Sequence, residues 1–305
     1  MRVIKKKVAC HPDYDFDVNC SSIVRHEYKF PTEIYTDGNF YKIIRLTNQD
    51  ILVSASIKSQ GGHKHLEISV DSDTICEKEE LILVNKIAVR LGASQDPTNF
   101  YNMAHNDPFL YTLVEKYRGL HIPQSISVYE SLIHSIIGQQ ISVHVANMLR
   151  ELVIETYGTK HEYNGITLYT FPSAEKFSTV TVSELQQNKF SRRKAEYITD
   201  ISKLQANGEI SLEELIYESS ERASEILIAL RGIGPWTINW LLMGSLGYDD
   251  AFPAGDLALQ KAMTKVPNGP TIISSAESLD FSERWRPFRS WATAYIFEAI
   301  RDGHL

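Results

Sequence analysis

Residues 230–256 read LRGIGPWTINWLLMGSLGYDDAFPAGD, and this stretch decides the fold. Apolar residues at helical spacing lead into it, and Gly232 and Gly234 then interrupt the helical pattern. Pro235 suits the first turn of a second helix, because the N–H that proline lacks has no partner there. Residues 236–246 are apolar enough for a mostly buried helix. The stretch therefore predicts two helices joined by a tight Gly-Ile-Gly hairpin, with glycines that allow positive φ and close approach to a ligand.

The predicted hairpin and the loop after it have features that could carry chemistry. Free N–H groups and the positive dipole end of the second helix favour an anion such as a phosphate. Downstream, Pro253 and Gly255 shape a loop that presents Asp256 at the head of the apolar segment 257–263. Each feature alone is more typical of an ordinary turn or an ordinary helix N-cap. Their combination is more specific, because it sets a carboxylate beside an anion cradle.

The amino-acid composition indicates the general class of protein. The 305 residues are enough for two domains, and 43% hydrophobic and 23% charged residues are typical of a soluble globular protein. We find no membrane-spanning run and no signal peptide, so we expect a cytoplasmic protein. Cys10, Cys20 and Cys76 fit neither a disulfide framework nor a four-cysteine metal or iron–sulfur site. A net charge of −7 argues against nucleic acid as a partner unless the local field differs from the total.

The pattern along the chain changes near residue 97. Before it, strand-like segments are separated by turn signals, and one helical segment follows them; they are 40–46, 51–57 and 66–70 as strands and 77–91 as a helix. After it, helical spacing continues to a final amphipathic helix over 282–300. We therefore expect an α+β protein, with an N-terminal antiparallel β-sheet domain at 1–104 and an all-helical domain at 105–305.

Basic and aromatic residues gather in the predicted helical domain. One basic cluster is Lys189, Arg192, Arg193 and Lys194, and the other is Arg284, Arg286 and Arg289. A solvated helix face and a phosphate-binding surface both remain open for these clusters. All four tryptophans also lie in this half. Most of its aromatic residues fit a helical core, but some could line a pocket that stacks a flat base.

Four segments, taken in order, resemble the helix-hairpin-helix DNA glycosylases. They are 131–143 (SLIHSIIGQQISV), 190–195 (FSRRKA), 230–237 (LRGIGPWT) followed by Asp256, and 284–290 (RWRPFRS). The last segment and the β-rich N-terminal region resemble the alkylation-repair branch, the bacterial 3-methyladenine DNA glycosylases of the AlkA type. The resemblance covers residues 105–305 well and the N-terminal region loosely.

The resemblance implies a base excision repair enzyme that flips an alkylated purine out of duplex DNA and hydrolyses its N-glycosidic bond. Asp256 would then stabilise the oxocarbenium-like state and help to activate water, since an alkylated purine already carries positive charge and leaves readily. The family's base pocket falls on Trp236, Trp240 and Phe297. Its DNA-binding positions fall on Gly232, Gly234, Gln139, Gln140, Arg193, Lys194 and Arg286.

The residues at the positions that vary within the family indicate which of its branches the chain resembles. Trp236 stands where lyase members carry a catalytic lysine, which implies a monofunctional hydrolase. The chain has no cysteine after Cys76, so no iron–sulfur cluster is implied and no cofactor is required. Family hairpins hold a structural monovalent cation through backbone carbonyls, which implies a candidate metal site at Leu230 and Gly232 (with Ile233). Gln140 departs from the apolar wedge of the branch.

Two alternatives remain open at this point. One is a bifunctional glycosylase for oxidised bases, and the other is a non-catalytic helix-hairpin-helix DNA-binding protein, which the acidic net charge disfavours. The resemblance implies duplex DNA containing alkylated bases as the partner, with no membrane and no obligate protein partner. Leu257 also departs from the branch, because it replaces an aromatic neighbour of the catalytic aspartate.

Overall fold

An antiparallel sheet forms the N-terminal part of the computed structural model, which describes residues 3–24, 28–46, 49–72, 74–163, 165–266 and 274–305. Its five strands have the order β1-β5-β4-β3-β2, with every neighbouring pair antiparallel. The strands are β1 (Val3–Ala9), β2 (Glu33–Thr36), β3 (Asn39–Leu46), β4 (Gln49–Gln60) and β5 (His63–Asp71). The three predicted strands are confirmed, and β1 and β2 complete the sheet.

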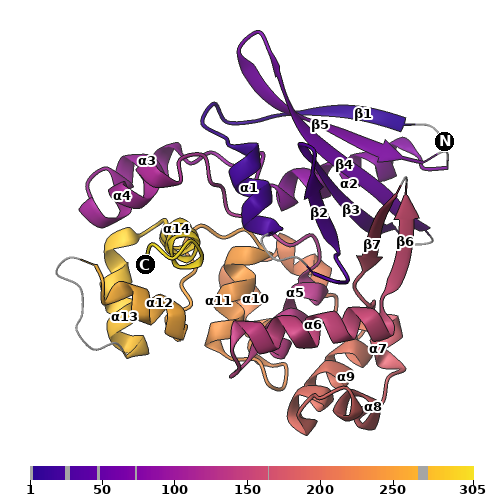
Figure 1. Ribbon diagram of the computed structural model, residues 1–305. Helices are drawn as coiled ribbons and strands as arrows, with labels where there is room; N and C mark the ends of the chain where they lie inside the picture. The colour runs from indigo at the N-terminus through magenta and orange to yellow at the C-terminus, as the bar shows by residue number, and fades with distance from the viewer. Residues whose placement is uncertain (1–2, 25–27, 47–48, 73, 164, 267–273) are drawn as a thin grey trace.

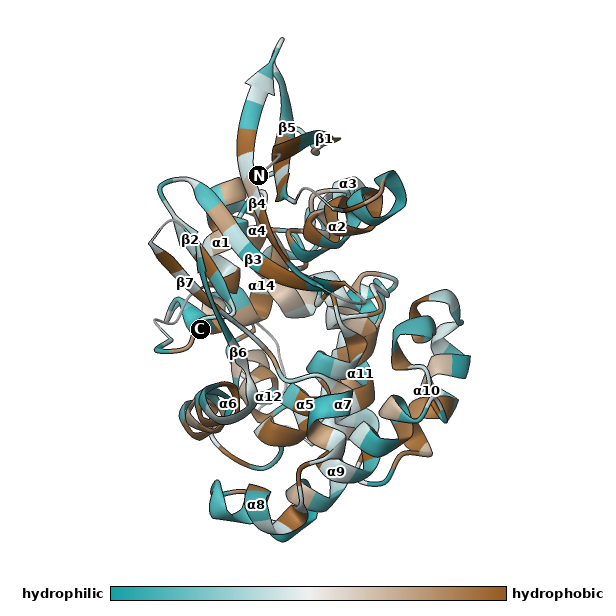
Figure 2. Ribbon diagram, turned by 90° about the vertical axis from the view of Figure 1, so that its right-hand side faces the viewer, coloured by the Kyte–Doolittle hydropathy of each residue, from teal (hydrophilic) through white to brown (hydrophobic). Residues whose placement is uncertain are grey.

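Two helices lie against this sheet, α1 (Phe16–Ile23) and α2 (Glu77–Arg90). They share a buried core with the sheet, in which Phe40, Leu66 and Ile87 are fully enclosed. The far end of the β4–β5 hairpin stands away from the rest of the fold and is largely hydrophilic (Figure 2). The sheet therefore packs its larger apolar face against the two helices and has a free, polar extension.

The rest of the chain is mainly helical (Figure 1). Its α-helices are α3 (Thr98–Ala104), α4 (Pro108–Lys116), α5 (Val128–Gly138), α6 (Val143–Tyr157), α7 (Ala174–Ser178), α8 (Val182–Gln187), α9 (Arg192–Ala206), α10 (Ser220–Ile228), α11 (Pro235–Gly244), α12 (Leu257–Met263), α13 (Ser275–Ser282) and α14 (Arg289–Arg301), with short 3₁₀ helices η1 (Leu212–Tyr217) and η2 (Glu283–Trp285). They enclose one large core that begins at Phe100, whereas the core of the sheet region ends at Ala93. The α+β fold is confirmed.

The prediction that the chain is all-helical beyond residue 97 is wrong at one place. A β-hairpin, β6 (Thr159–Tyr163) and β7 (Ile166–Thr170), follows α6 and lies beside β2 and β3 (Figure 1). Leu168 of β7 packs with Ile43 and Leu52 of the N-terminal sheet in a small core of its own. The β-branched and aromatic residues of β7 favour a strand, and the apolar surface of the sheet provides its partner.

The prediction of a final helix over 282–300 is also wrong about the residue at which that helix begins. Helix α13 ends at Ser282, η2 follows, and α14 begins only at Arg289. Pro287 explains the break, because it lacks an N–H and disfavours helical geometry in the residue before it. Among the described parts of the chain, every helix is too short or too polar to cross a lipid bilayer.

Candidate active site

The predicted hairpin joins α10 to α11, and its two glycines have different roles. Gly232 has a φ of +89°, and a Cβ there would lie 2.3 Å from Cδ2 of Tyr197 on α9. Gly234 is the N-cap of α11 with a φ of −129°, and a Cβ there would meet nothing within 4 Å. Positive φ is therefore found at Gly232 and not at Gly234. Only Gly232 needs to be glycine for the turn, whereas Gly234 leaves the start of α11 open.

We expect Gly232→Ala to destabilise the protein by about 1–3 kcal/mol from backbone strain, and by more if the Tyr197 ring cannot move. Chemical denaturation measures the loss, and binding to a duplex with an abasic-site analogue measures its effect on the hairpin. Gly234→Ala is the matched control for stability and should destabilise the protein much less, since its φ and surroundings accept a Cβ. Equal losses in the two variants would contradict this assignment.

Asp256 is the N-cap of α12, at the end of the loop that follows α11. Its Oδ1 accepts from the backbone N–H groups of Ala258 and Leu259, both at 3.0 Å. Its Oδ2 accepts from Nε1 of Trp236, also at 3.0 Å. Three donors therefore hold this half-buried carboxylate in one orientation.

The three predicted aromatic residues form one cluster. The rings of Trp236 and Trp240 are 6.2 Å apart with their planes at 67°, and those of Trp240 and Phe297 are 5.0 Å apart at 48°. The two indole rings therefore meet in an edge-to-face arrangement. The indole of Trp236 therefore links Asp256 to this aromatic cluster.

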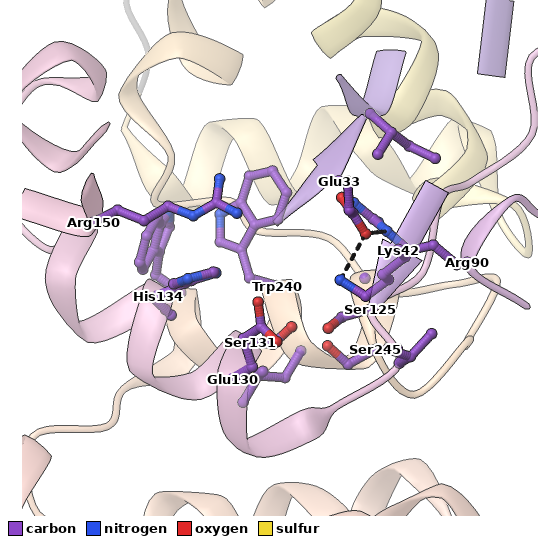
Figure 3. Close-up of a pocket in the computed structure, with 16 residues that line it drawn as sticks. Glu33, Lys42, Arg90, Ser125, Glu130, Ser131, His134, Arg150, Trp240 and Ser245 are labelled. Carbon is purple, nitrogen blue, oxygen red and sulfur yellow. Dashed lines mark hydrogen bonds and ion pairs between the residues drawn. The ribbon is translucent and has the colours of Figure 1, made fainter. Parts of the chain in front are cut away.

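A cavity of about 360 Å³ lies next to this cluster, with Trp236 and Trp240 among its lining residues (Figure 3). Its volume falls within the range of small-molecule sites. The N-terminal sheet region contributes Glu33, Lys42 and Arg90 to the lining, and α6 contributes Arg150. The sequence patterns did not indicate these four residues, because they come from segments whose contact is set only by tertiary packing.

The charged residues from the N-terminal region form a buried ion-pair trio. Glu33 accepts from Nε and Nη2 of Arg90 at 2.6 and 2.7 Å, and its Oε1 lies 3.0 Å from Nζ of Lys42. Burial alone would raise the pKa of Glu33, but the Arg90 and Lys42 charges outweigh it and hold that pKa far below its usual value. The trio places a fixed net positive charge at one end of the cavity.

The predicted DNA-binding residues of the Gly-Gln segment lie beside the hairpin. Nε2 of Gln139 donates to the carbonyl of Gly232 at 3.0 Å and contacts Oγ1 of Thr237 at 3.4 Å. Gln140 is exposed in the turn between α5 and α6, with a φ of +56°. Gln139 therefore supports the hairpin directly, whereas Gln140 faces solvent.

The two basic clusters differ in how far their charges are satisfied within the fold. Arg193 is exposed at the start of α9, whereas Nζ of Lys194 donates to the carbonyl of Ile137 at 2.7 Å, and burial lowers its pKa. In the second cluster, Arg286 forms ion pairs with Asp250 and Glu283, both at 2.6 Å. Arg284 and Arg289 are likewise ion-paired, to Asp107 and to Asp250. The second cluster thus serves first to fix the start of α14.

The hairpin carbonyls predicted to hold a monovalent cation already have protein donors. The carbonyl of Leu230 accepts from the Ile233 N–H at 3.1 Å, and that of Gly232 accepts from Gln139. Each carbonyl oxygen keeps a second lone pair, so the residues can still contribute to a cation site. The cation remains a prediction.

Comparisons with known proteins agree with this geometry. A hairpin between two helices, followed by a carboxylate at a helix N-terminus and an aromatic cluster, is the arrangement that the resemblance to a base-excising DNA glycosylase predicts. A family model described as HhH-GPD superfamily base excision DNA repair protein matches residues 133–287. A DNA-3-methyladenine glycosylase of Bacillus subtilis (strain 168) is 30% identical over 289 residues, which are 94% of each chain. The chain belongs to the HhH-GPD superfamily, and the predicted family is confirmed.

Solved structures place the whole chain in the same fold. The 3-methyladenine DNA glycosylase of Archaeoglobus fulgidus matches with a TM-score of 0.82 at 27% identity, over 97% of this chain and 98% of that one. A Clostridium acetobutylicum 8-oxoguanine glycosylase/lyase, solved in complex with double-stranded DNA, matches with a TM-score of 0.72 at 20% identity, over 100% and 99% of the two chains. At that identity the second likeness shows the fold alone.

Proposed function

We propose that this protein is a monofunctional DNA glycosylase that hydrolyses the N-glycosidic bond of alkylated purines, such as 3-methyladenine, flipped out of duplex DNA. The observation that carries the proposal is the link between Asp256 and Trp236, which joins a fixed carboxylate to the wall of a cavity of about 360 Å³. The relatives named 3-methyladenine glycosylases support the choice of substrate. The exposed start of α11 and the side chain of Arg193 would bind phosphates of the DNA backbone.

The proposed reaction requires the protein only to position the flipped nucleotide and to supply a negative charge near the sugar. A purine alkylated on a ring nitrogen is cationic, so it leaves C1′ as a neutral base without being protonated. The sugar then gains oxocarbenium character, which the negative charge of Asp256 stabilises. Water adds to C1′ and gives its proton to the carboxylate, and the product is an abasic site. Asp256 is the catalytic residue of this scheme, and Trp236 both positions it and stacks the base.

The proposal is tested with methylated duplex DNA and the purified protein. We expect chromatography to show free 3-methyladenine, with a strand that stays intact until alkali is added. Binding to the duplex without release of any base would instead support a non-catalytic DNA-binding protein.

Borohydride trapping separates hydrolysis from lyase chemistry. A lyase joins an amine to C1′ as a Schiff base, which borohydride reduces to a stable protein–DNA adduct. We expect no adduct, because position 236 holds tryptophan and the cavity-lining Lys42 is ion-paired with Glu33. A trapped adduct would identify the protein as a bifunctional glycosylase.

A further inference from the structure

Two exposed arginine side chains meet at one carboxylate beside the helix hairpin. Glu196 of α9 accepts from Nε of Arg192 at 2.9 Å and from Nη2 of Arg231 at 2.8 Å. Arg192 is the first residue of α9, whereas Arg231 lies in the hairpin directly before Gly232. One carboxylate therefore holds together two guanidinium groups from separate parts of the helical region.

Further contacts fix the hairpin side of this cluster. The guanidinium group of Arg231 lies over the ring of Tyr197, with its Cζ 5.3 Å from the ring centroid. The same ring lies close to Gly232, since a Cβ at that glycine would be 2.3 Å from it. Asp200, one turn after Glu196 on α9, lies 3.6 Å from Nη1 of Arg231. Arg231 is thus held against α9 by two ion pairs and a cation–π contact.

The arginines are more exposed than the carboxylate that joins them. The side chains of Arg192 and Arg231 are 78% and 61% exposed, whereas that of Glu196 is 22% exposed. A guanidinium group has five N–H donors. Among the hydrogen bonds of the described residues, each of these two arginines uses one donor, to Glu196. The other donors are therefore available to an anion that approaches from solvent.

The charge around this cluster is positive, although the protein as a whole is acidic. Residues 189–200 together with Arg231 contain five basic and two acidic side chains, whereas the whole chain has a net charge of −7. A local positive field attracts a polyanion even where the total charge is negative. The planar fork of a guanidinium group also matches two oxygens of a phosphate. The ligand class that fits the cluster is therefore the phosphodiester of a nucleic-acid backbone.

We propose that Arg192 and Arg231 form a phosphate-binding site for the backbone of duplex DNA. This inference rests on the proposed function and adds a contact that it does not include. Arg193 follows Arg192 directly, and Arg231 precedes the first residue of α11 by four positions, so the pair adjoins both elements already assigned to the backbone. Glu196 keeps the two guanidinium groups together before DNA arrives, so less side-chain freedom is lost when a phosphate binds.

The site is tested by binding of the purified protein to an undamaged duplex over a range of salt concentrations. We expect Arg192→Met and Arg231→Met each to weaken binding at low salt by about tenfold, the size of losing one hydrogen bond to a charged group. The plot of log affinity against log salt concentration should become less steep by about one in each variant. Both side chains are exposed, so both variants should fold, and urea unfolding checks that they do.

Arg222→Met is the matched control. Arg222 is also exposed and paired with a glutamate, Glu225 at 2.9 Å, but it lies in the first turn of α10, at the opposite end from the hairpin. Its affinity and salt dependence should stay at the wild-type values. Wild-type binding by either Arg192→Met or Arg231→Met, or an equal loss in Arg222→Met, would overturn the inference. A wild-type protein that bound the duplex in the expected way but released no alkylated base would refute the proposed function and leave the phosphate site supported.

Discussion

Asp256→Asn should lower the rate of base release from methylated DNA by about 10³-fold. The substitution removes the negative charge that would stabilise the oxocarbenium-like state, and it removes the acceptor for the proton of water. The fold should survive, because asparagine is as good an N-cap as aspartate, and its Oδ1 can still accept from Ala258 and Leu259. Single-turnover base release measures the effect.

Binding should separate from chemistry in this variant. We expect its affinity for a duplex with an abasic-site analogue to equal or exceed that of the wild type, because a negative charge beside the DNA backbone is lost. Asp107→Asn is the matched control, since Asp107 also caps a helix and also accepts from an indole, Nε1 of Trp285 at 2.9 Å. That variant should lose stability, because it also breaks the ion pair of Asp107 with Arg284, but it should keep its rate when folded. Near-wild-type release by Asp256→Asn would exclude Asp256 as the catalytic residue.

Glu33→Gln should lower the free energy of unfolding by about 3–5 kcal/mol at neutral pH. The glutamine leaves the charges of Arg90 and Lys42 buried without their shared partner, at the junction of β2, β3 and α2. Urea unfolding gives the value. Glu225→Gln, in an exposed i,i+3 pair with Arg222, is the control and should leave the midpoint unchanged.

Acid should remove the same contribution from the wild-type protein. Because the folded-state pKa of Glu33 is lowered, its contribution is fully present above the unfolded pKa of about 4.3 and is lost as pH falls below that value. We therefore expect the difference in stability between wild type and Glu33→Gln to shrink steadily below about pH 4. A difference that stayed constant down to pH 3 would contradict the role of the ion pairs.

Local patterns in the sequence were sufficient for the hairpin and its carboxylate. Glycine, proline and apolar spacing predicted the end of α10 and the start of α11, and an aspartate before an apolar segment predicted the N-cap of α12. Such signals depend only on residues close together in the chain, so they can be recognised in a single sequence. The same approach failed for β7, because its partner is a neighbouring sheet, and it overlooked the local signal of Pro287 before the start of α14.

The sequence by itself determined the two-part architecture, the helix-hairpin-helix and the position of Asp256, because helix caps and glycine turns are short-range. Only the tertiary structure decided that Trp236 binds Asp256, that Arg286 is ion-paired, and that Lys194 is bound to the carbonyl of Ile137. It alone also assembled the cavity, whose lining comes from β2, β3, α2, α5, α6 and α11. A cavity is formed where separate elements pack against each other, so no local pattern can contain it.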